Sequence, residues 1–189
     1  MDTRTCNKLN HSGTTTLYTE RLVLRKFQIS DAEDMFNNWA ADEDVARYTL
    51  WRKNESISET REFLRDWSSR YTSDEYYHWA IVYKENHQVI GSISVSSINN
   101  LLKTGNIGYT IGKSYWNLGI ATEALKNVLD FMINNIGMER IYAYHDINNR
   151  ASGRVMQKCG MKFIKRKKKI FLNTYKPYIE CDYYCYRIN

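Results

Sequence analysis

The stretch Tyr109-Thr-Ile-Gly-Lys-Ser-Tyr-Trp-Asn-Leu-Gly-Ile-Ala-Thr-Glu-Ala124 predicts a strand, a short turn and the start of a helix. A helix that begins here leaves the backbone N–H groups of residues 117–122 without intrahelical partners, at the positive end of the helix dipole. Gly119 has no side chain, so a ligand can approach the backbone closely. The stretch therefore predicts a site for an anion such as a pyrophosphate.

The segment that follows Gly119 has the pattern of a long amphipathic helix, which Gly137 ends. Polar residues such as Lys126 and Asp130 fall on one face. The apolar residues of the opposite face recur at helical spacing and are Ile120, Ala124, Leu125, Val128, Leu129, Met132, Ile133 and Ile136.

Three groups of residues along the chain form recognisable motifs. The first is the central stretch, with Tyr115, Trp116, Gly119 and Ala121-Thr-Glu-Ala124. The second lies downstream and consists of Asn149-Arg-Ala-Ser152 followed by Lys158-Cys-Gly160-Met-Lys-Phe163. The third lies upstream and consists of Glu20-Arg-Leu-Val-Leu-Arg-Lys-Phe27 followed by Ser30-Asp-Ala-Glu33.

Together these motifs resemble the GCN5-related N-acetyltransferase (GNAT) superfamily, and within it the ribosomal-protein N-terminal acetyltransferases (the RimJ/RimL-like branch). Trp116 stands at the first place of the phosphate loop Gln/Arg-x-x-Gly-x-Gly/Ala, where aromatic residues are usual in this branch. Met161 stands where phenylalanine is commoner. The resemblance extends over roughly residues 18 to 188, and the three motifs are in the family's order.

The pattern along the chain predicts an α/β (α+β) fold. Residues 1–17 are polar and aperiodic and are expected to form a loose tail, with a single acetyltransferase domain over 18–189. Ser30 and Glu33 are expected to form a capping box, and Asp42 or Asp44 to cap a short helical turn. Strands are expected at 20–27, 76–84, 89–98, 105–112, 140–145, 162–172 and 178–187, and helices at 30–39, 58–71, 120–136 and 148–159.

A helix connects the strand that ends near Gly112 to the strand that begins near Arg140, which requires these two strands to be parallel. Hairpins elsewhere require antiparallel neighbours. We therefore expect a mixed, mostly antiparallel, twisted sheet of about seven strands flanked by about four helices. The resemblance implies the GNAT fold, in which these two strands splay apart.

The composition is that of one soluble domain. The chain has 189 residues, of which 43% are hydrophobic and 25% charged, and it contains neither a membrane-length apolar run nor a secretory signal. The four cysteines are scattered and suit reduced thiols, and the scattered histidines predict no metal site. A cytoplasmic location is the expectation.

The net charge of +6 is unevenly distributed. Residues 30–66 contain ten acidic and five basic side chains, whereas residues 137–189 contain twelve basic and four acidic ones. This asymmetry would draw a polyanionic cofactor such as coenzyme A toward the second half and a cationic amine toward the first, although most such charges are solvated surface groups.

The resemblance implies that acetyl-CoA is the cosubstrate and that its pantetheine arm lies between the splayed strands. Backbone groups near Thr110 to Gly112 are then expected to bond the pantetheine amides, and one N–H to polarise the thioester carbonyl. The hydroxyl of Thr122 either bonds a phosphate or stabilises the helix N-terminus. The residues expected to contact acetyl-CoA are Thr110, Ile111, Gly112, Trp116, Asn117, Leu118, Gly119, Ile120, Ala121, Thr122, Asn149, Ser152 and Lys158.

The resemblance also assigns catalytic roles. Ser152 resembles the serine that donates a proton to the departing CoA thiolate, a role served by tyrosine in other branches. That tyrosine's place here is held by Met156, which cannot donate. Tyr144 or Tyr109 is an alternative acid. Asn149 is expected to contact pantetheine or to cap its own helix.

No general base is evident in the sequence. Some relatives carry a glutamate where this chain has Tyr144, and Glu180, Asp182, His78 or a bound water remain as candidates. An α-amine with a pKa near 7.7–8.0 is appreciably neutral at cytoplasmic pH, whereas a lysine ε-amine near 10.4 is not. Direct attack by an α-amine therefore needs no base.

These observations predict an N-acetyltransferase that transfers acetyl by direct attack to a protein N-terminal amine. The alternatives are a small-molecule amine such as an antibiotic or polyamine, and a non-catalytic CoA-binding or RNA-associating module. Aromatic residues of the N-terminal half, such as Trp39, Trp51 and Trp67, are core or groove residues. The basic run Lys165–Lys169 is expected to be solvated, with nucleic-acid contact the less favoured reading. The protein is expected to be a monomer or homodimer.

Overall fold

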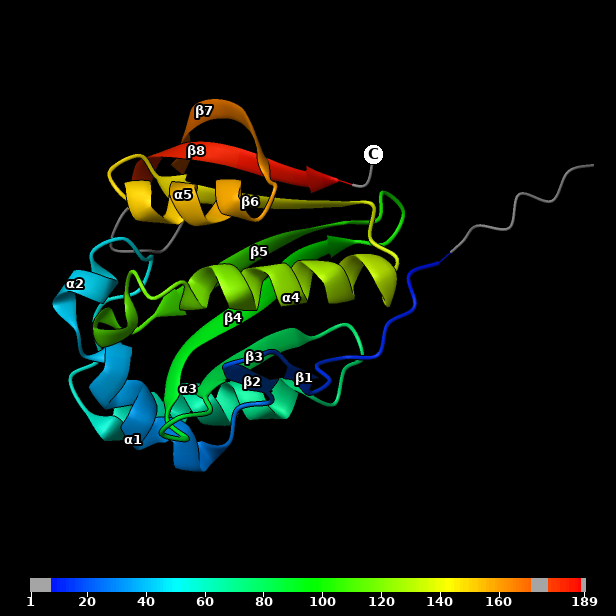
Figure 1. The fold of residues 1–189 in the computed structure, drawn as a ribbon. Coiled ribbons are helices and arrows are strands. Elements are labelled where there is room, and N and C mark those ends of the chain that lie inside the picture. Colours follow the sequence, from blue (N-terminus) through cyan, green and yellow to red (C-terminus); the bar gives the residue numbers. More distant parts are fainter. Residues whose placement is uncertain (1–7, 171–176, 188–189) are drawn as a thin grey trace, which may run out of the picture.

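The sheet contains one parallel pair of strands, β5 (Thr104–Ile111) and β6 (Arg140–Asp146). In the computed structural model, which describes residues 8–170 and 177–187, eight strands lie in the order β1-β2-β3-β4-β5-β6-β8-β7 (Figure 1). The other neighbouring pairs among these described strands are antiparallel. The predicted mixed, mostly antiparallel sheet is confirmed, with the two-residue β1 as the strand that the sequence did not indicate.

The remaining elements follow the predicted order closely. The strands are β1 (Leu17–Tyr18), β2 (Leu22–Arg25), β3 (Tyr77–Tyr83), β4 (Val89–Asn99), β7 (Lys162–Ile170) and β8 (Tyr178–Arg187). The α-helices are α1 (Ala32–Met35), α2 (Glu43–Ala46), α3 (Ile57–Arg70), α4 (Ile120–Asn134) and α5 (Arg150–Lys158). The predicted end of β7 at residues 171–172 lies outside the described residues.

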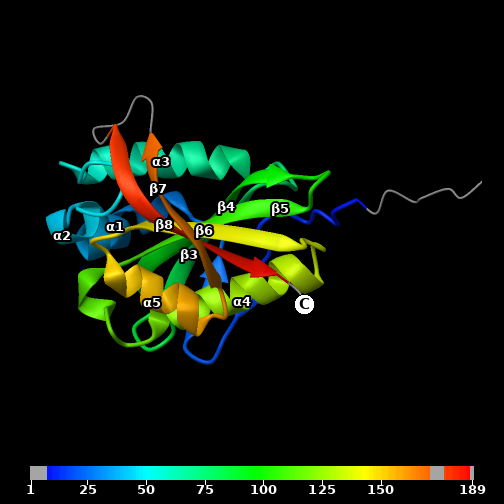
Figure 2. The ribbon, with the colours of Figure 1, turned by 90° about the horizontal axis from the view of Figure 1, so that it is seen from above.

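Helices cover both faces of the sheet, with α4 and α5 on one face and α3 on the other (Figure 2). Leu125, Val128 and Met132 of α4 are fully buried in the larger core, so the predicted apolar face of this helix is confirmed. A second core lies between α1, α3 and the strands β3 and β4, around Trp39 and Leu64. Among the described residues, none of the helices combines the length and apolar character that a membrane span requires.

The segment 29–40 differs from its prediction. The capping box joins Gln28 and Asp31 rather than Ser30 and Glu33, and the backbone N–H of Gln28 donates to Asp31 Oδ2 at 2.8 Å. Asp31 is buried and also accepts two hydrogen bonds from the guanidinium of Arg25, at 2.7 and 2.8 Å. This ion pair fixes the start of the segment, which then runs as a 3₁₀ turn, the short α1 and a π-helical turn instead of one α-helix.

Residues 8–16 do not form the loose tail that we predicted. Leu9 is 7% exposed and Thr14 is 3% exposed. The Thr14 hydroxyl donates to the carbonyl of Tyr76 at 2.8 Å and accepts from the N–H of His78 at 2.9 Å. Thr14 thus pairs with backbone groups of the sheet. Composition alone cannot distinguish such a polar side chain from one that is solvated.

Two glycines on the central strands differ in the space around them. A Cβ at Gly91 would collide with the carbonyl oxygen of Thr110, whereas a Cβ at Gly108 would meet nothing within 4 Å. We predict that Gly91→Ala lowers the free energy of unfolding by about 1–3 kcal/mol, because the strands must move apart. Gly108→Ala should change it by less than about 0.5 kcal/mol. Thermal or denaturant unfolding measures both, and equal effects would contradict this packing.

Candidate active site

The two parallel strands pair only at their beginnings. Register runs from Thr104 opposite Arg140 to Asn106 opposite Tyr142 and then stops, although β5 continues to Ile111 and β6 to Asp146. Beyond that point the facing edges of β5 and β6 have no strand between them, as the implied splay requires. Unpaired backbone groups at such an edge can bond an extended ligand as an added strand would.

Of the three residues Thr110 to Gly112, which we expected to bond pantetheine, only Ile111 turns its backbone groups away from β4. Gly112 donates its N–H to the carbonyl of Ile90 at 2.8 Å, and Thr110 pairs with Ser92, so both turn their backbone groups toward β4. Because successive residues of a strand alternate, the N–H of Ile111 faces the gap. The carbonyl of Ile111 accepts from Trp116 Nε1 at 2.8 Å, so the N–H is its free backbone group.

The loop before α4 has the backbone form of an anion site. Asn117 and Gly119 have positive φ angles of 62° and 77°. Within the described part of the chain, the backbone N–H groups of residues 117–122 donate no hydrogen bond. Such a series of free N–H groups at a helix N-terminus fits a diphosphate, as the sequence predicted for this loop.

A half-buried ion pair fastens this loop to the turn between β1 and β2. Glu123 accepts from the Thr19 hydroxyl at 2.6 Å, from the backbone N–H of Arg21 at 2.9 Å and from Arg21 Nε at 2.7 Å. Arg21 also donates through Nη1 to the carbonyl of Leu118 at 2.9 Å. Burial raises the pKa of Glu123, but these hydrogen bonds outweigh it and the pKa is lowered. Arg21 and Glu123 belong to two of the three sequence motifs, but no sequence pattern indicates that they are in contact.

The start of α5 lies on the other side of the gap. Asn149 caps this helix, since its Oδ1 accepts from the backbone N–H of Ser152 at 3.2 Å. Its amide group lines the same cleft as Arg150, Arg154 and Lys158. The three cations lie on the side to which a phosphate-bearing ligand would be drawn.

Packing against β6 fixes the position of α5. A Cβ at Gly153 would come within 2.5 Å of His145 Nε2, so only glycine allows the helix to lie this close. The His145 ring is 7% exposed, and its Nδ1 lies 2.7 Å from the carbonyl of Asp146.

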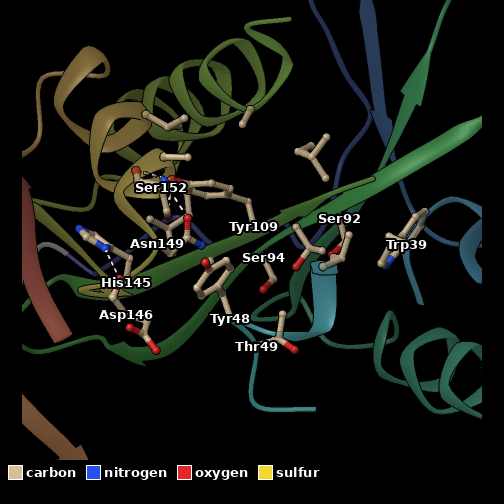
Figure 3. A pocket seen from close by; sticks show the side chains of 18 of the residues that line it. Trp39, Tyr48, Thr49, Ser92, Ser94, Tyr109, His145, Asp146, Asn149 and Ser152 are labelled. Carbon is tan, nitrogen blue, oxygen red and sulfur yellow. Dashed lines mark hydrogen bonds between the residues drawn. The ribbon is translucent and has the colours of Figure 1, made fainter. Parts of the chain in front are cut away.

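Ser152 contacts Tyr109 of β5 across the gap (Figure 3). The Tyr109 hydroxyl lies 2.9 Å from Ser152 Oγ and 3.0 Å from the Ser152 carbonyl. Burial raises the pKa of Tyr109, so the phenol stays protonated. Tyr144, our other candidate acid, has the ammonium of Lys169 3.3 Å from its ring centroid.

These elements surround a cleft of about 1070 Å³. Its second half, away from α5, is lined by Tyr48 and Thr49, by β4 and β5, and by aromatic residues such as Trp39 (Figure 3). Asp146 is the one carboxylate among the described lining residues. The acidic side chains of residues 30–66 therefore do not line the cleft, and an attraction of a cationic amine by their combined charge stays a prediction.

The candidate bases are poorly placed. His78 lines the cleft, but burial lowers its pKa to about 3, and its ring is tilted against that of Trp67 with the centroids 4.3 Å apart. Asp182 is paired with Arg166 at 2.7 and 3.0 Å, and neither it nor Glu180 lines the cleft. The described residues contain no cluster of histidine, cysteine or carboxylate side chains suited to a metal ion.

The basic run Lys165–Lys169 lies in β7, at the edge of the sheet. Arg166 pairs with Asp182, and Lys169 is partly buried over Tyr144. Lysines on an edge strand discourage pairing with a second sheet, so their number does not require a nucleic-acid partner. Contact with RNA stays a prediction.

Comparison with known proteins agrees with this geometry. The model of the acetyltransferase (GNAT) domain family matches residues 21–162. An uncharacterized N-acetyltransferase, YoaA of Bacillus subtilis, is 30% identical over 144 residues, which are 76% of this chain and 81% of YoaA.

Two solved structures share the fold. A putative ribosomal-protein-serine acetyltransferase from Vibrio cholerae superposes with a TM-score of 0.83 at 19% identity, covering 94% of this chain and 99% of that one. The ribosomal L7/L12 α-N-protein acetyltransferase RimL, in complex with coenzyme A, gives 0.80 at 17% identity, covering 92% and 98%. The chain belongs to the GNAT acetyltransferases. It is an acetyl-CoA-dependent N-acetyltransferase.

The Glu123 ion pair predicts a defined defect. In Glu123→Ala the loop loses its attachment to Arg21 and Thr19, so we expect the dissociation constant for coenzyme A to rise about tenfold, as loss of charged hydrogen bonds would cause. Calorimetry measures this dissociation constant. Asp130→Ala, which removes an exposed carboxylate of the same helix, is the control and should leave the constant unchanged. Equal constants for the two variants would rule out the attachment.

Proposed function

We propose that this enzyme acetylates the α-amine at the N-terminus of a protein. The proposal rests on the side chains that line the acceptor half of the cleft, most of which are hydroxyl-bearing or aromatic. Among the described residues that line the cleft, Asp146 alone carries a carboxylate. The ribosomal-protein names of two structural neighbours suggest the class of acceptor, although likeness at this identity concerns the fold.

The runner-up acceptor is a small amine such as a polyamine or an aminoglycoside-like antibiotic. These molecules carry several positive charges, and specific binding of a polycation needs several carboxylates. The cleft offers Asp146 against Arg150, Arg154, Lys158 and Lys169. This balance favours an acceptor with one amine and an otherwise uncharged surface.

In this proposal acetyl-CoA, the cosubstrate of GNAT enzymes, is held along its whole length. The free N–H groups of residues 117–122 bind the diphosphate, with the Thr122 hydroxyl beside them, and Lys158 lies on the phosphate side. Pantetheine occupies the gap between β5 and β6 next to Asn149. The Ile111 N–H faces that gap and can donate to the thioester carbonyl, where negative charge develops.

Transfer is direct in this proposal, because the cysteines within residues 8–170 and 177–187 are unsuited to carry an acyl group. Burial raises the pKa of Cys159 and of Cys181 to about 11, which leaves both as thiols, and neither lines the cleft. The neutral acceptor nitrogen attacks the thioester carbon, the C–S bond then breaks to release the CoA thiolate, and the nitrogen loses its extra proton to solvent. An α-amine attacks without a protein base because much of it is neutral near pH 7.5.

The leaving thiolate needs a hydrogen-bond donor, and we assign that role to Ser152. The Tyr109 hydroxyl orients it. When the tyrosine donates its proton to Ser152 Oγ, the serine hydrogen is released toward the sulfur, and the raised pKa of Tyr109 keeps that proton in place. In this assignment Tyr144 has no part in the proton transfer.

Conservative variants test the pair. We expect Tyr109→Phe and Ser152→Ala each to lower kcat about tenfold or more while the dissociation constant of acetyl-CoA stays the same. The double variant should be little worse than either single one, because the two hydroxyls act together. Tyr144→Phe is the control with kcat near wild type. Steady-state kinetics measures kcat for all four variants. Losses that add in the double variant would show that the two hydroxyls act independently.

An acceptor panel tests the proposed function. With lysine-containing peptides that have a free N-terminus, the enzyme should release CoA thiol and place acetyl on the α-nitrogen. When the N-terminus of the same peptides is blocked, so that only the lysine amine is available, the reaction should be far slower. The rate should rise with pH through about 7.7–8.0, as the α-amine loses its proton. Mass spectrometry locates the acetyl group. Faster turnover of spermidine or kanamycin would refute the proposal.

A further inference from the structure

A band of small polar side chains lies on the floor of the acceptor half of the cleft. Ser92, Ser94 and Ser96 occupy alternate positions of β4, so they share one face of the sheet. Their partners on β5 are Thr110, Gly108 and Asn106, in the same order. All six residues line the cleft, and we call them the polar strip.

The polar side chains of the strip have no hydrogen-bond partner among the residues that the structure describes. Within the described residues, no hydrogen bond involves the side chain of Ser92, Ser94, Ser96, Asn106 or Thr110. Ser92 and Ser94 are half-buried, and the residue between them, Ile93, is fully buried in the core beneath α4. Half-buried hydroxyls in a row need partners, which a ligand or water must supply.

The strip has the dimensions of an extended chain. Alternate residues of a strand are about 6.6 Å apart, so Ser92 to Ser96 spans about 13 Å. An extended polypeptide repeats its main-chain groups at the same interval. The strip therefore offers one hydroxyl or amide group for every two residues of an extended chain, over a length of about four residues. It starts at Thr110, beside the Ile111 N–H that faces the gap.

The middle of the strip is open. A Cβ at Gly108 would meet nothing within 4 Å, although Gly91, on the neighbouring strand, has no room for one. The absent side chain leaves space over the sheet about 7 Å from Thr110, where the third residue of an extended acceptor would lie.

We propose that the polar strip binds the first three or four residues of an extended polypeptide acceptor through its main-chain groups. This rests on the proposed function and adds the subsite. The acceptor class is a flexible, uncharged N-terminal segment, since the described lining residues carry Lys169 and the cations of α5 against the single Asp146. Gly108 selects it by leaving the floor clear, and the serines hold it.

Peptide length tests this subsite. Serine amide and neutral peptides of two, four and eight residues that begin with serine are compared as acceptors. We expect kcat/KM to rise about tenfold or more from the amide to the tetrapeptide, as two or three hydrogen bonds would produce, and to change little from four to eight residues. A length-independent rate overturns the proposal.

Variants locate the effect. Gly108→Leu places a side chain over the strip, so it should bring the ratio of kcat/KM for the tetrapeptide to kcat/KM for serine amide close to one. Thr104→Leu places the same leucine side chain on the same face of β5 but outside the cleft, and it should keep the length advantage. Ser94→Ala, which removes one hydroxyl without added bulk, should reduce the advantage about threefold or more.

The outcomes separate the two proposals. If no peptide is acetylated while another amine is, both the proposed function and the strip's role fail. If peptides are acetylated but Gly108→Leu and Ser94→Ala behave as Thr104→Leu does, the α-amine function stands and the strip is not the subsite.

Discussion

Two parallel strands that stop pairing after three residues create the site on which this enzyme depends. Beyond Asn106 and Tyr142, β5 and β6 continue without hydrogen bonds between them. Unpaired strand edges are costly unless something else bonds them, so the separation must be held by other parts of the fold. The helix α4, which connects the strands, packs into the larger core, and α5 is held against β6 where Gly153 meets His145.

The same gap joins the functional parts. The free N–H groups of residues 117–122 lie at one end of α4, the Ile111 N–H faces the gap, and the hydroxyls of Tyr109 and Ser152 meet across it. The Glu123 ion pair connects the start of α4 to the turn between β1 and β2, so the loop before α4 is held from the far side of the sheet. The groups proposed to bind acetyl-CoA and those proposed to catalyse transfer thus share one frame, which is the condition for positioning a thioester against an amine.

The sequence predicted those features that depend on neighbours along the chain. The apolar repeat of α4 follows from residue types at helical spacing, and the structure confirms it. The failures have physical causes as well. Asp31, buried against Arg25, replaced Glu33 as the acidic residue of the capping box, and Thr14 bonds the backbone of β3 instead of water.

By itself, the amino-acid sequence determined the family, the order of the elements and the loop that carries the free N–H groups, because each of these is encoded within about twenty residues. Only the tertiary structure decided which side chains meet. Thr19 and Glu123 are 104 residues apart, and Tyr109 and Ser152 are 43 apart. Such contacts are set by how helices pack on the sheet, and no local pattern of residues records that packing.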